Sequence, residues 1–213
     1  MSWLIGLTGT IALTAFAHIQ GHYREKQWYV YFFKPLTTSL IILLAVTISF
    51  FDTTTYRLAI LAGLFFCLFG DIALMLPKDR FIPGLVSFLI GHIFYIVAFS
   101  QGWTGFHTGY LVLSSVICFG FLTILWPHLG KMKSPVTIYS LVIGALLWCA
   151  FERWHALSDI TSFIGLVGVI LFVTSDSILA FNRFVQQKFW AEGTLLVLYY
   201  SAQVLIVLSI GLA

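Results

Sequence analysis

Long apolar segments separated by short polar breaks run along the whole chain, and they constrain its fold more than any other feature. Each is close to the roughly 20 apolar residues that an α-helix needs to cross a bilayer. The pattern predicts eight transmembrane helices. The predicted spans are Trp3–Ile19, Val30–Phe50, Leu58–Leu76, Ile82–Ser100, Thr108–Trp126, Pro135–Phe151, Thr161–Phe181 and Ala191–Leu212.

The low content of charged residues excludes an ordinary soluble enzyme. Only 9% of the 213 residues are charged and 60% are hydrophobic, whereas a soluble domain has about a quarter charged residues. The longest polar stretch, residues 18–28, is too short to fold alone. We therefore expect residues 1–213 to form a single all-α domain of eight transmembrane helices, in the bilayer and without a nucleic-acid partner.

The basic residues predict how the helices are oriented. Of the eleven Lys and Arg residues, eight lie in the first, third, fifth and seventh connections and two in the even-numbered ones, with Lys34 inside a span. Because positive charge collects on the cytoplasmic side, the odd connections are predicted to be cytoplasmic and both termini non-cytoplasmic. The eight residues are Arg24, Lys26, Lys78, Arg80, Lys131, Lys133, Arg183 and Lys188.

Two aspartates lie inside predicted spans, where a carboxylate is unfavourable. An ionisable residue at a helix centre costs about 2.5–3.5 kcal/mol on insertion scales. Asp71 and Asp176 each lie about five residues from the predicted cytoplasmic end of their span, roughly 8 Å deep at about 1.5 Å per residue. Lys34, Tyr139 and Glu192 lie at similar levels on three other spans. Together these residues predict a cavity open toward the cytoplasmic leaflet.

Other polar side chains extend this pattern. His92 lies near the middle of its span, and Glu192, Tyr199 and Gln203 fall on one face of the last span. Small residues predict close helix packing on two further spans. They are Gly84, Ser87 and Gly91 on the span 82–100, and Gly165 and Gly168 on the span 161–181.

Each candidate also has a purely structural interpretation. Asp71 and Asp176 could form a hydrogen bond or an ion pair with Lys34. The lysine side chain could instead extend to the membrane interface, as long basic side chains do. His92 could be a buried, hydrogen-bonded histidine, and Glu192 could be solvated at the edge of its span.

Two carboxyl groups close together in a dry site would supply an acid and a base. They cannot both ionise readily, so they share one proton, and such a pair suits a hydrolysis that needs no metal. The sequence has no HExxH pattern, no GxSxG motif and no Gly-rich phosphate loop. The three cysteines lie inside apolar runs without a CxxC motif. We therefore predict no disulfide, no metal and no cofactor.

Several motifs give the chain a resemblance to a known family. They are KP at residues 34–35, GDIALML at 70–76, FIPGLVSFLIGHIFY at 81–95, SDSILAFNRF at 175–184 and LYYSAQVLI at 198–206. In this combination and order they resemble the YhhN family of lysoplasmalogenase-like membrane proteins, over nearly the whole chain.

The resemblance implies a membrane hydrolase that cleaves the vinyl-ether bond of lysoplasmalogens, giving a fatty aldehyde and a glycerophospho-base. Asp71 and Asp176 would then be the acid and the base, in either order. A lysophospholipid would be the substrate, and the expected location is the bacterial inner (plasma) membrane. Residues expected to line the cavity and bind substrate or water are Lys34, His92, Tyr139, Glu192, Tyr199, Tyr200 and Gln203.

Other functions use the same kind of residue. Buried carboxylates with a lysine also suit a small proton-coupled transporter, although the chain shows no internal repeat and no matched pair of broken helices. An intramembrane aspartyl protease also uses two aspartates, but its GxGD motif is incomplete because Leu68 occupies the position of the first glycine. A lipid-binding or assembly protein without catalytic activity is the remaining alternative.

Overall fold

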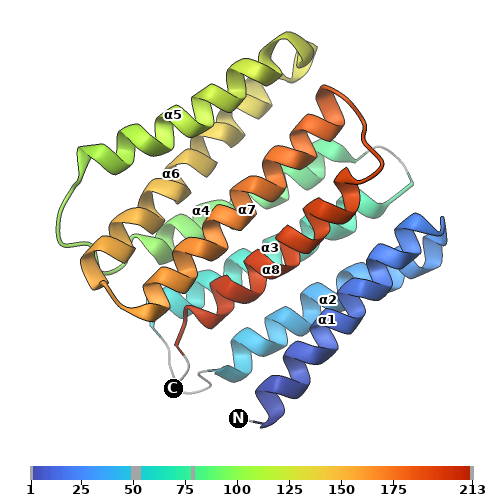
Figure 1. Cartoon of the computed structure of the whole chain (residues 1–213), viewed down its shortest axis with the longest axis horizontal. Helices are drawn as coiled ribbons and strands as arrows, with labels where there is room; N and C mark the ends of the chain where they lie inside the picture. Colours follow the sequence, from blue (N-terminus) through green and yellow to red (C-terminus); the bar gives the residue numbers. More distant parts are fainter. Residues whose placement is uncertain (1, 49–53, 78–79, 212–213) are drawn as a thin grey trace.

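The computed structural model describes residues 2–48, 54–77 and 80–211 and contains eight α-helices within these ranges (Figure 1). All eight are long and apolar enough to cross a membrane, as predicted, and the chain is an integral membrane protein. The helices are α1 (Ser2–Tyr23), α2 (Gln27–Ile48), α3 (Thr55–Met75), α4 (Phe81–Phe99), α5 (Thr108–Leu125), α6 (Lys133–Leu157), α7 (Ile160–Phe184) and α8 (Ala191–Leu208).

Most helix ends lie within a few residues of the predicted ones, and α6 differs most. It continues six residues beyond the predicted end at Phe151 and stops at Ser158, which has a left-handed backbone conformation (φ 50°). The added turns carry Glu152, whose carboxylate accepts a hydrogen bond from Trp148 Nε1 one turn earlier (2.9 Å). The predicted span ends Phe50 and Leu212, and the predicted cytoplasmic Lys78, lie outside the described residues.

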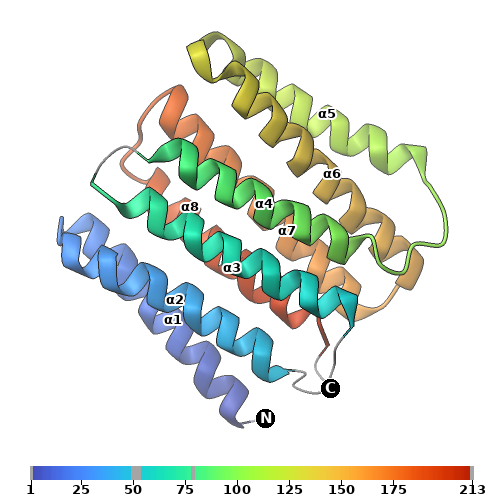
Figure 2. The same ribbon diagram turned by 180° about the vertical axis from the view of Figure 1, so that it is seen from behind.

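Consecutive helices run antiparallel, and the bundle is built from pairs (Figures 1 and 2). The pairs α3–α4 and α7–α8 have the most extensive contacts and lie at the centre. The α1–α2 pair lies on one side and packs on α3 and α8, while α5 and α6 lie on the other side. Because the number of helices is even, α1 begins and α8 ends at the same end of the bundle.

Glycines bring the central helices close together. A Cβ atom added at Gly91 of α4 would lie 3.0 Å from the carbonyl oxygen of Gly63 on α3. At Gly168 of α7 it would lie 3.0 Å from the backbone nitrogen of Ile206 on α8. These positions confirm the prediction that small residues on spans 4 and 7 mark tight packing.

The helix α7 begins with a side-chain cap. Asp159 accepts a hydrogen bond from the backbone N–H of Ser162 (2.7 Å) and another from the hydroxyl of Thr161 (2.9 Å). The Ser162 N–H group holds the pKa of the Asp159 carboxyl below its usual range, because the bond favours the charged form. The cap satisfies an N–H group that the first turn of a helix leaves without a partner.

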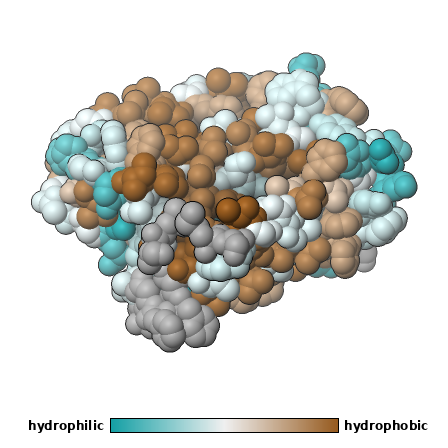
Figure 3. All heavy atoms as spheres, turned by 60° about the horizontal axis from the view of Figure 1, so that its bottom comes forward, coloured by the Kyte–Doolittle hydropathy of each residue, from teal (hydrophilic) through white to brown (hydrophobic). Residues whose placement is uncertain are grey.

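The outer surface of the bundle is suited to lipid. Large hydrophobic side chains are exposed on each of the eight helices. On the face shown in Figure 3, hydrophobic residues spread across the middle and hydrophilic residues gather toward the two ends. This distribution matches a bilayer core with a polar interface on either side.

Candidate functional site

A polar cavity of about 430 Å³ lies at the end of the bundle that carries the odd-numbered connections. Residues from the α3–α4 connection, such as Pro77, and from the α7–α8 connection, such as Gln187, form part of its wall. Asp71 and Asp176 both line it. The predicted residues Lys34, Glu192 and Tyr199 complete this part of the wall.

Asp71 is buried and held by three side chains from two neighbouring helices. Its Oδ2 atom accepts hydrogen bonds from the hydroxyls of Thr38 (2.7 Å) and Tyr199 (2.8 Å). Lys34 Nζ lies 3.6 Å from the other oxygen, Oδ1. Lys34 and Thr38 are one turn apart on α2, so they present an ammonium and a hydroxyl to the same carboxylate.

Asp176 has a different set of neighbours, on α6 and α4. The hydroxyl of Tyr139 donates a hydrogen bond to its Oδ2 (2.7 Å), and His92 Nε2 lies 3.6 Å from the same oxygen. His92 is fully buried with its ring edge-on to Phe172 (centroids 4.7 Å apart). Among the described residues, neither ring nitrogen of His92 makes a hydrogen bond of ordinary geometry, so the ring is a buried polar group beside Asp176.

Local packing fixes the two aspartates in the bundle. A Cβ atom at Gly70 would lie 2.6 Å from the ring of Phe88, so the glycine before Asp71 lets α4 approach α3 at this level. The hydroxyl of Ser175 donates to the carbonyl oxygen of Leu195 (2.9 Å) and joins α7 to α8 beside Asp176. The GD and SD pairs of the sequence therefore each combine a packing residue with a carboxylate.

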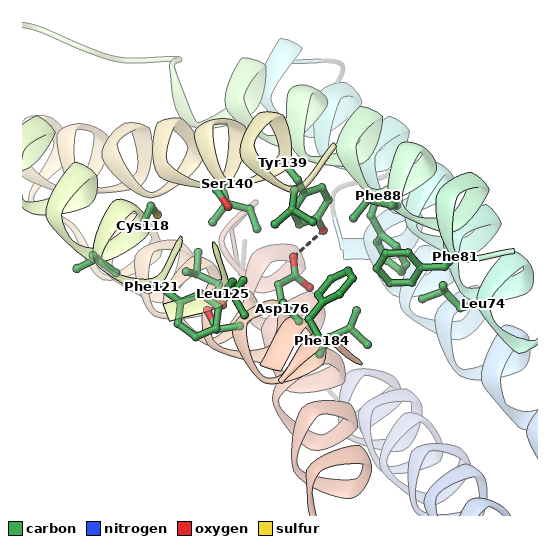
Figure 4. Close-up of a pocket in the computed structure, with 18 residues that line it drawn as sticks. Leu74, Phe81, Phe88, Cys118, Phe121, Leu125, Tyr139, Ser140, Asp176 and Phe184 are labelled. Atoms are coloured by element: carbon green, nitrogen blue, oxygen red, sulfur yellow. Dashed lines mark hydrogen bonds between the residues drawn. The ribbon is translucent and has the colours of Figure 1, made fainter. Parts of the chain in front are cut away.

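A second, apolar cavity of about 70 Å³ meets the first at Asp176 (Figure 4). Figure 4 shows Asp176 and Tyr139 joined by their hydrogen bond, with Phe88, Phe81 and Leu125 among the surrounding apolar side chains. Asp176 thus lies at the boundary between the cavity lined by charged side chains and the cavity lined by apolar ones.

The predicted binding residues do not all line the two cavities. Lys34, Glu192 and Tyr199 line the polar cavity, and Tyr139 lines the apolar one. His92 contacts Asp176 without lining either cavity. Tyr200 and Gln203 lie outside both walls: the Tyr200 hydroxyl is hydrogen-bonded to His18 Nδ1 (2.9 Å), and Gln203 Oε1 accepts a hydrogen bond from the Tyr95 hydroxyl (2.6 Å).

Sequence reasoning missed three residues of the site. Thr38 binds Asp71, and Arg80 and Arg183 line the polar cavity. Thr38 could have been predicted from the sequence, because it follows Lys34 by one helical turn. For a metal, the described part of the chain offers no group of three or more His, Cys, Asp or Glu side chains that could hold one.

Comparison with known proteins identifies the family of the chain. The sequence model of the YhhN family matches residues 29–210, which include both aspartates and every site residue named in this subsection except His18. The chain belongs to the YhhN family. No solved structure matches it.

Its relatives come from bacteria and mammals. The membrane protein YhhN of Escherichia coli O6:H1 is 27% identical over 204 residues, covering 95% of this chain and 97% of that protein. Lysoplasmalogenase TMEM86A of Bos taurus is 31% identical over 188 residues, covering 82% of this chain and 74% of the relative. Lysoplasmalogenase TMEM86B of Homo sapiens is 32% identical over 141 residues, 66% of this chain and 58% of the relative. Relatives of the chain therefore include mammalian proteins named lysoplasmalogenases.

Proposed function

We propose that this protein hydrolyses the vinyl-ether bond of lysoplasmalogens, with Asp71 and Asp176 as its acid and base. The observation that carries the proposal is that both aspartates line one cavity whose wall also holds basic side chains. The names of the mammalian relatives support the same reaction.

The reaction fits a site with one acid and one base. Proton transfer to the chain-side carbon of the vinyl ether gives an oxocarbenium ion at the carbon that bears the oxygen. Water adds to this carbon and gives up a proton to the base. As the hemiacetal collapses to a fatty aldehyde, the protonated base gives its proton to the leaving glycerol oxygen and the ionised acid takes the proton of the hemiacetal hydroxyl. One water is consumed and both carboxyl groups return to their starting forms.

The surroundings of the two carboxylates support different roles for them. Asp71 faces an ammonium and two hydroxyl donors, which favour the charged form and suit a base that orients water. Asp176 faces one hydroxyl donor and lines the apolar cavity as well. It is therefore beside the place where the chain-side carbon of a lipid would lie, and we assign it the role of acid.

The basic residues of the polar cavity suit the phosphate of the head group. Lys34, Arg80 and Arg183 all line this cavity, and guanidinium groups bind phosphate oxygens through paired hydrogen bonds. Pro77 and Gln187, from the α3–α4 and α7–α8 connections, line the same cavity, so a head group bound there would lie at this end of the bundle.

The test is aldehyde release from lysoplasmenylethanolamine by the purified protein. Asp71→Asn and Asp176→Asn should each lower kcat about 10²–10⁴-fold, the range expected when a general acid or base is lost. Asp159→Asn is the matched control: it makes the same chemical change at the other end of the bundle and keeps a good helix cap. Wild-type rates in both site variants would refute the aspartate pair, since neither carboxylate would then be needed.

The same buried groups also support a second candidate function, that of a proton-coupled carrier. Lys34–Asp71 and His92–Asp176 are two acid–base contacts inside membrane-spanning helices, as a proton relay requires. Uptake of a lipid or solute into proteoliposomes without chemical change, together with no aldehyde from any lysolipid, would favour this candidate over hydrolysis.

A further inference from the structure

Three cavities follow one another across the bundle, from the polar cavity lined by α2, α3, α4, α7 and α8 to a groove between α5 and α6. The polar cavity and the apolar cavity share Asp176 and Phe88. The apolar cavity shares Cys118 and Ser140 with a groove of about 220 Å³ between α5 and α6. A molecule that starts in the polar cavity can therefore continue past Asp176 into surroundings that are almost wholly hydrocarbon.

The direction of this path is that of a lipid chain in its own leaflet. Along α6 it passes Tyr139, Ser140, Gly144 and Trp148, a distance of roughly 13 Å at about 1.5 Å per residue. It leads from the end of the bundle with the odd-numbered connections toward the opposite membrane surface. A lipid whose head group lies in the polar cavity would extend its tail the same way without turning.

The path is accessible from the bilayer along α5. Ile117, in the wall of the apolar cavity, and Phe119, in the wall of the groove, are 43% and 47% exposed on the lipid-facing surface. The helix α5 lies at the edge of the bundle, packed mainly on α6 (Figure 1). A chain can therefore move sideways from the lipid into the path without crossing the polar rim.

We propose that this path holds the single hydrocarbon chain of the substrate, with the bond to be cleaved beside Asp176 and the chain running past Ser140 toward Trp148. The inference rests on the proposed hydrolysis and adds the site that selects the hydrophobic part of the substrate. The apolar cavity of about 70 Å³ is much smaller than the polar one of about 430 Å³, which favours one chain over two. Ser140 and Cys118, at the junction with the groove, are the residues that a chain must pass.

Cys118 provides a test of binding that does not depend on catalysis. Cys67 and Cys149 are buried, whereas Cys118 is partly exposed and lines two of the three cavities. A lysophospholipid with a saturated hexadecyl ether has no vinyl-ether bond to cleave, and it should slow alkylation of Cys118 by a lipid-soluble maleimide at least fivefold. The same phospholipid head group without a hydrocarbon chain should slow it less than twofold. Peptide mass spectrometry measures the labelling, and equal labelling with and without a saturating hexadecyl ether would overturn the proposal.

A blocked path gives the second test. Ser140→Phe places an aromatic ring at the junction, so the ratio of kcat/KM for hexadecenyl over butenyl lysoplasmalogens should fall at least tenfold, because the short chain ends before the junction. Ile138→Phe is the matched control, on the lipid-exposed face of the same helix and outside the three walls. It should leave this ratio within twofold of wild type. An unchanged ratio in Ser140→Phe would overturn the chain site.

The two experiments separate this proposal from the proposed function. If the wild-type protein releases no aldehyde from any lysoplasmalogen while the hexadecyl ether protects Cys118, the hydrolysis is wrong and the chain site stands. If aldehyde is released and Cys118 is not protected, the hydrolysis stands and the chain lies elsewhere.

Discussion

Thr38 connects α2 to the buried carboxylate of Asp71 through a single hydroxyl group. Thr38→Val removes this hydroxyl with little change of shape. A hydrogen bond to a charged group contributes about 1.5–3 kcal/mol, so kcat should fall roughly ten- to hundredfold. Thr37→Val is the matched control, because the Thr37 hydroxyl is buried but donates to the Phe33 carbonyl oxygen of its own helix (2.7 Å). Steady-state aldehyde release measures both variants, and an unaltered kcat in Thr38→Val would show that this bond does not support catalysis.

At the scale of single residues, the sequence indicates the side chains whose burial in a membrane costs much free energy. It does not indicate site residues whose burial costs little. Asp71 and Asp176 could be singled out because a carboxylate inside a span needs partners. Thr38 was marked only by its spacing from Lys34, since most threonines in these helices donate to a carbonyl oxygen of their own helix, as Thr47 and Thr174 do. Tyr200 was placed with its neighbour Tyr199, but adjacent residues of a helix point in different directions.

Helix pairing can be tested at Gly168, where α7 meets α8. A Cβ atom there would lie 3.0 Å from the Ile206 nitrogen and 3.1 Å from the Ala202 oxygen, both backbone atoms that cannot easily move. Gly168→Ala should therefore lower the free energy of unfolding by about 1–3 kcal/mol. Gly120→Ala on α5 is the control, because no atom lies within 4 Å of its added Cβ, and it should cause no loss. Unfolding in mixed detergent micelles with dodecyl sulfate measures both, and equal stability of the two variants would contradict tight α7–α8 packing.

At the scale of helices, apolar periodicity predicted the existence and order of the eight spans because each must fill the thickness of a bilayer. It did not predict the end of α6, since the helix continues through polar residues once the hydrocarbon region is passed. Nor could it predict contacts between helices far apart in sequence, such as α2 with α8 and α4 with α6. The contact of α2 with α8 places Thr38 and Tyr199 together on Asp71, and the contact of α4 with α6 places His92 and Tyr139 together beside Asp176.

At the scale of the whole molecule, the site lies at one end of an asymmetric bundle. The polar cavity is at the end with the odd-numbered connections, and the proposed chain path runs from it toward the other end. The orientation of the bundle therefore decides which leaflet supplies the substrate. The distribution of basic residues predicts the cytoplasmic leaflet.

This orientation can be measured with one cysteine on each side of the membrane. In a Cys118→Ala background, whose remaining cysteines Cys67 and Cys149 are buried, Gln186→Cys marks the α7–α8 connection and Thr104→Cys the α4–α5 connection, both at exposed positions. A membrane-impermeant maleimide should label Thr104→Cys in intact cells and Gln186→Cys only after the membrane is opened. The reverse pattern would place the cavity in the outer leaflet. The proposed substrate would then have to come from the non-cytoplasmic side, although the chemistry assigned to the two aspartates would be unchanged.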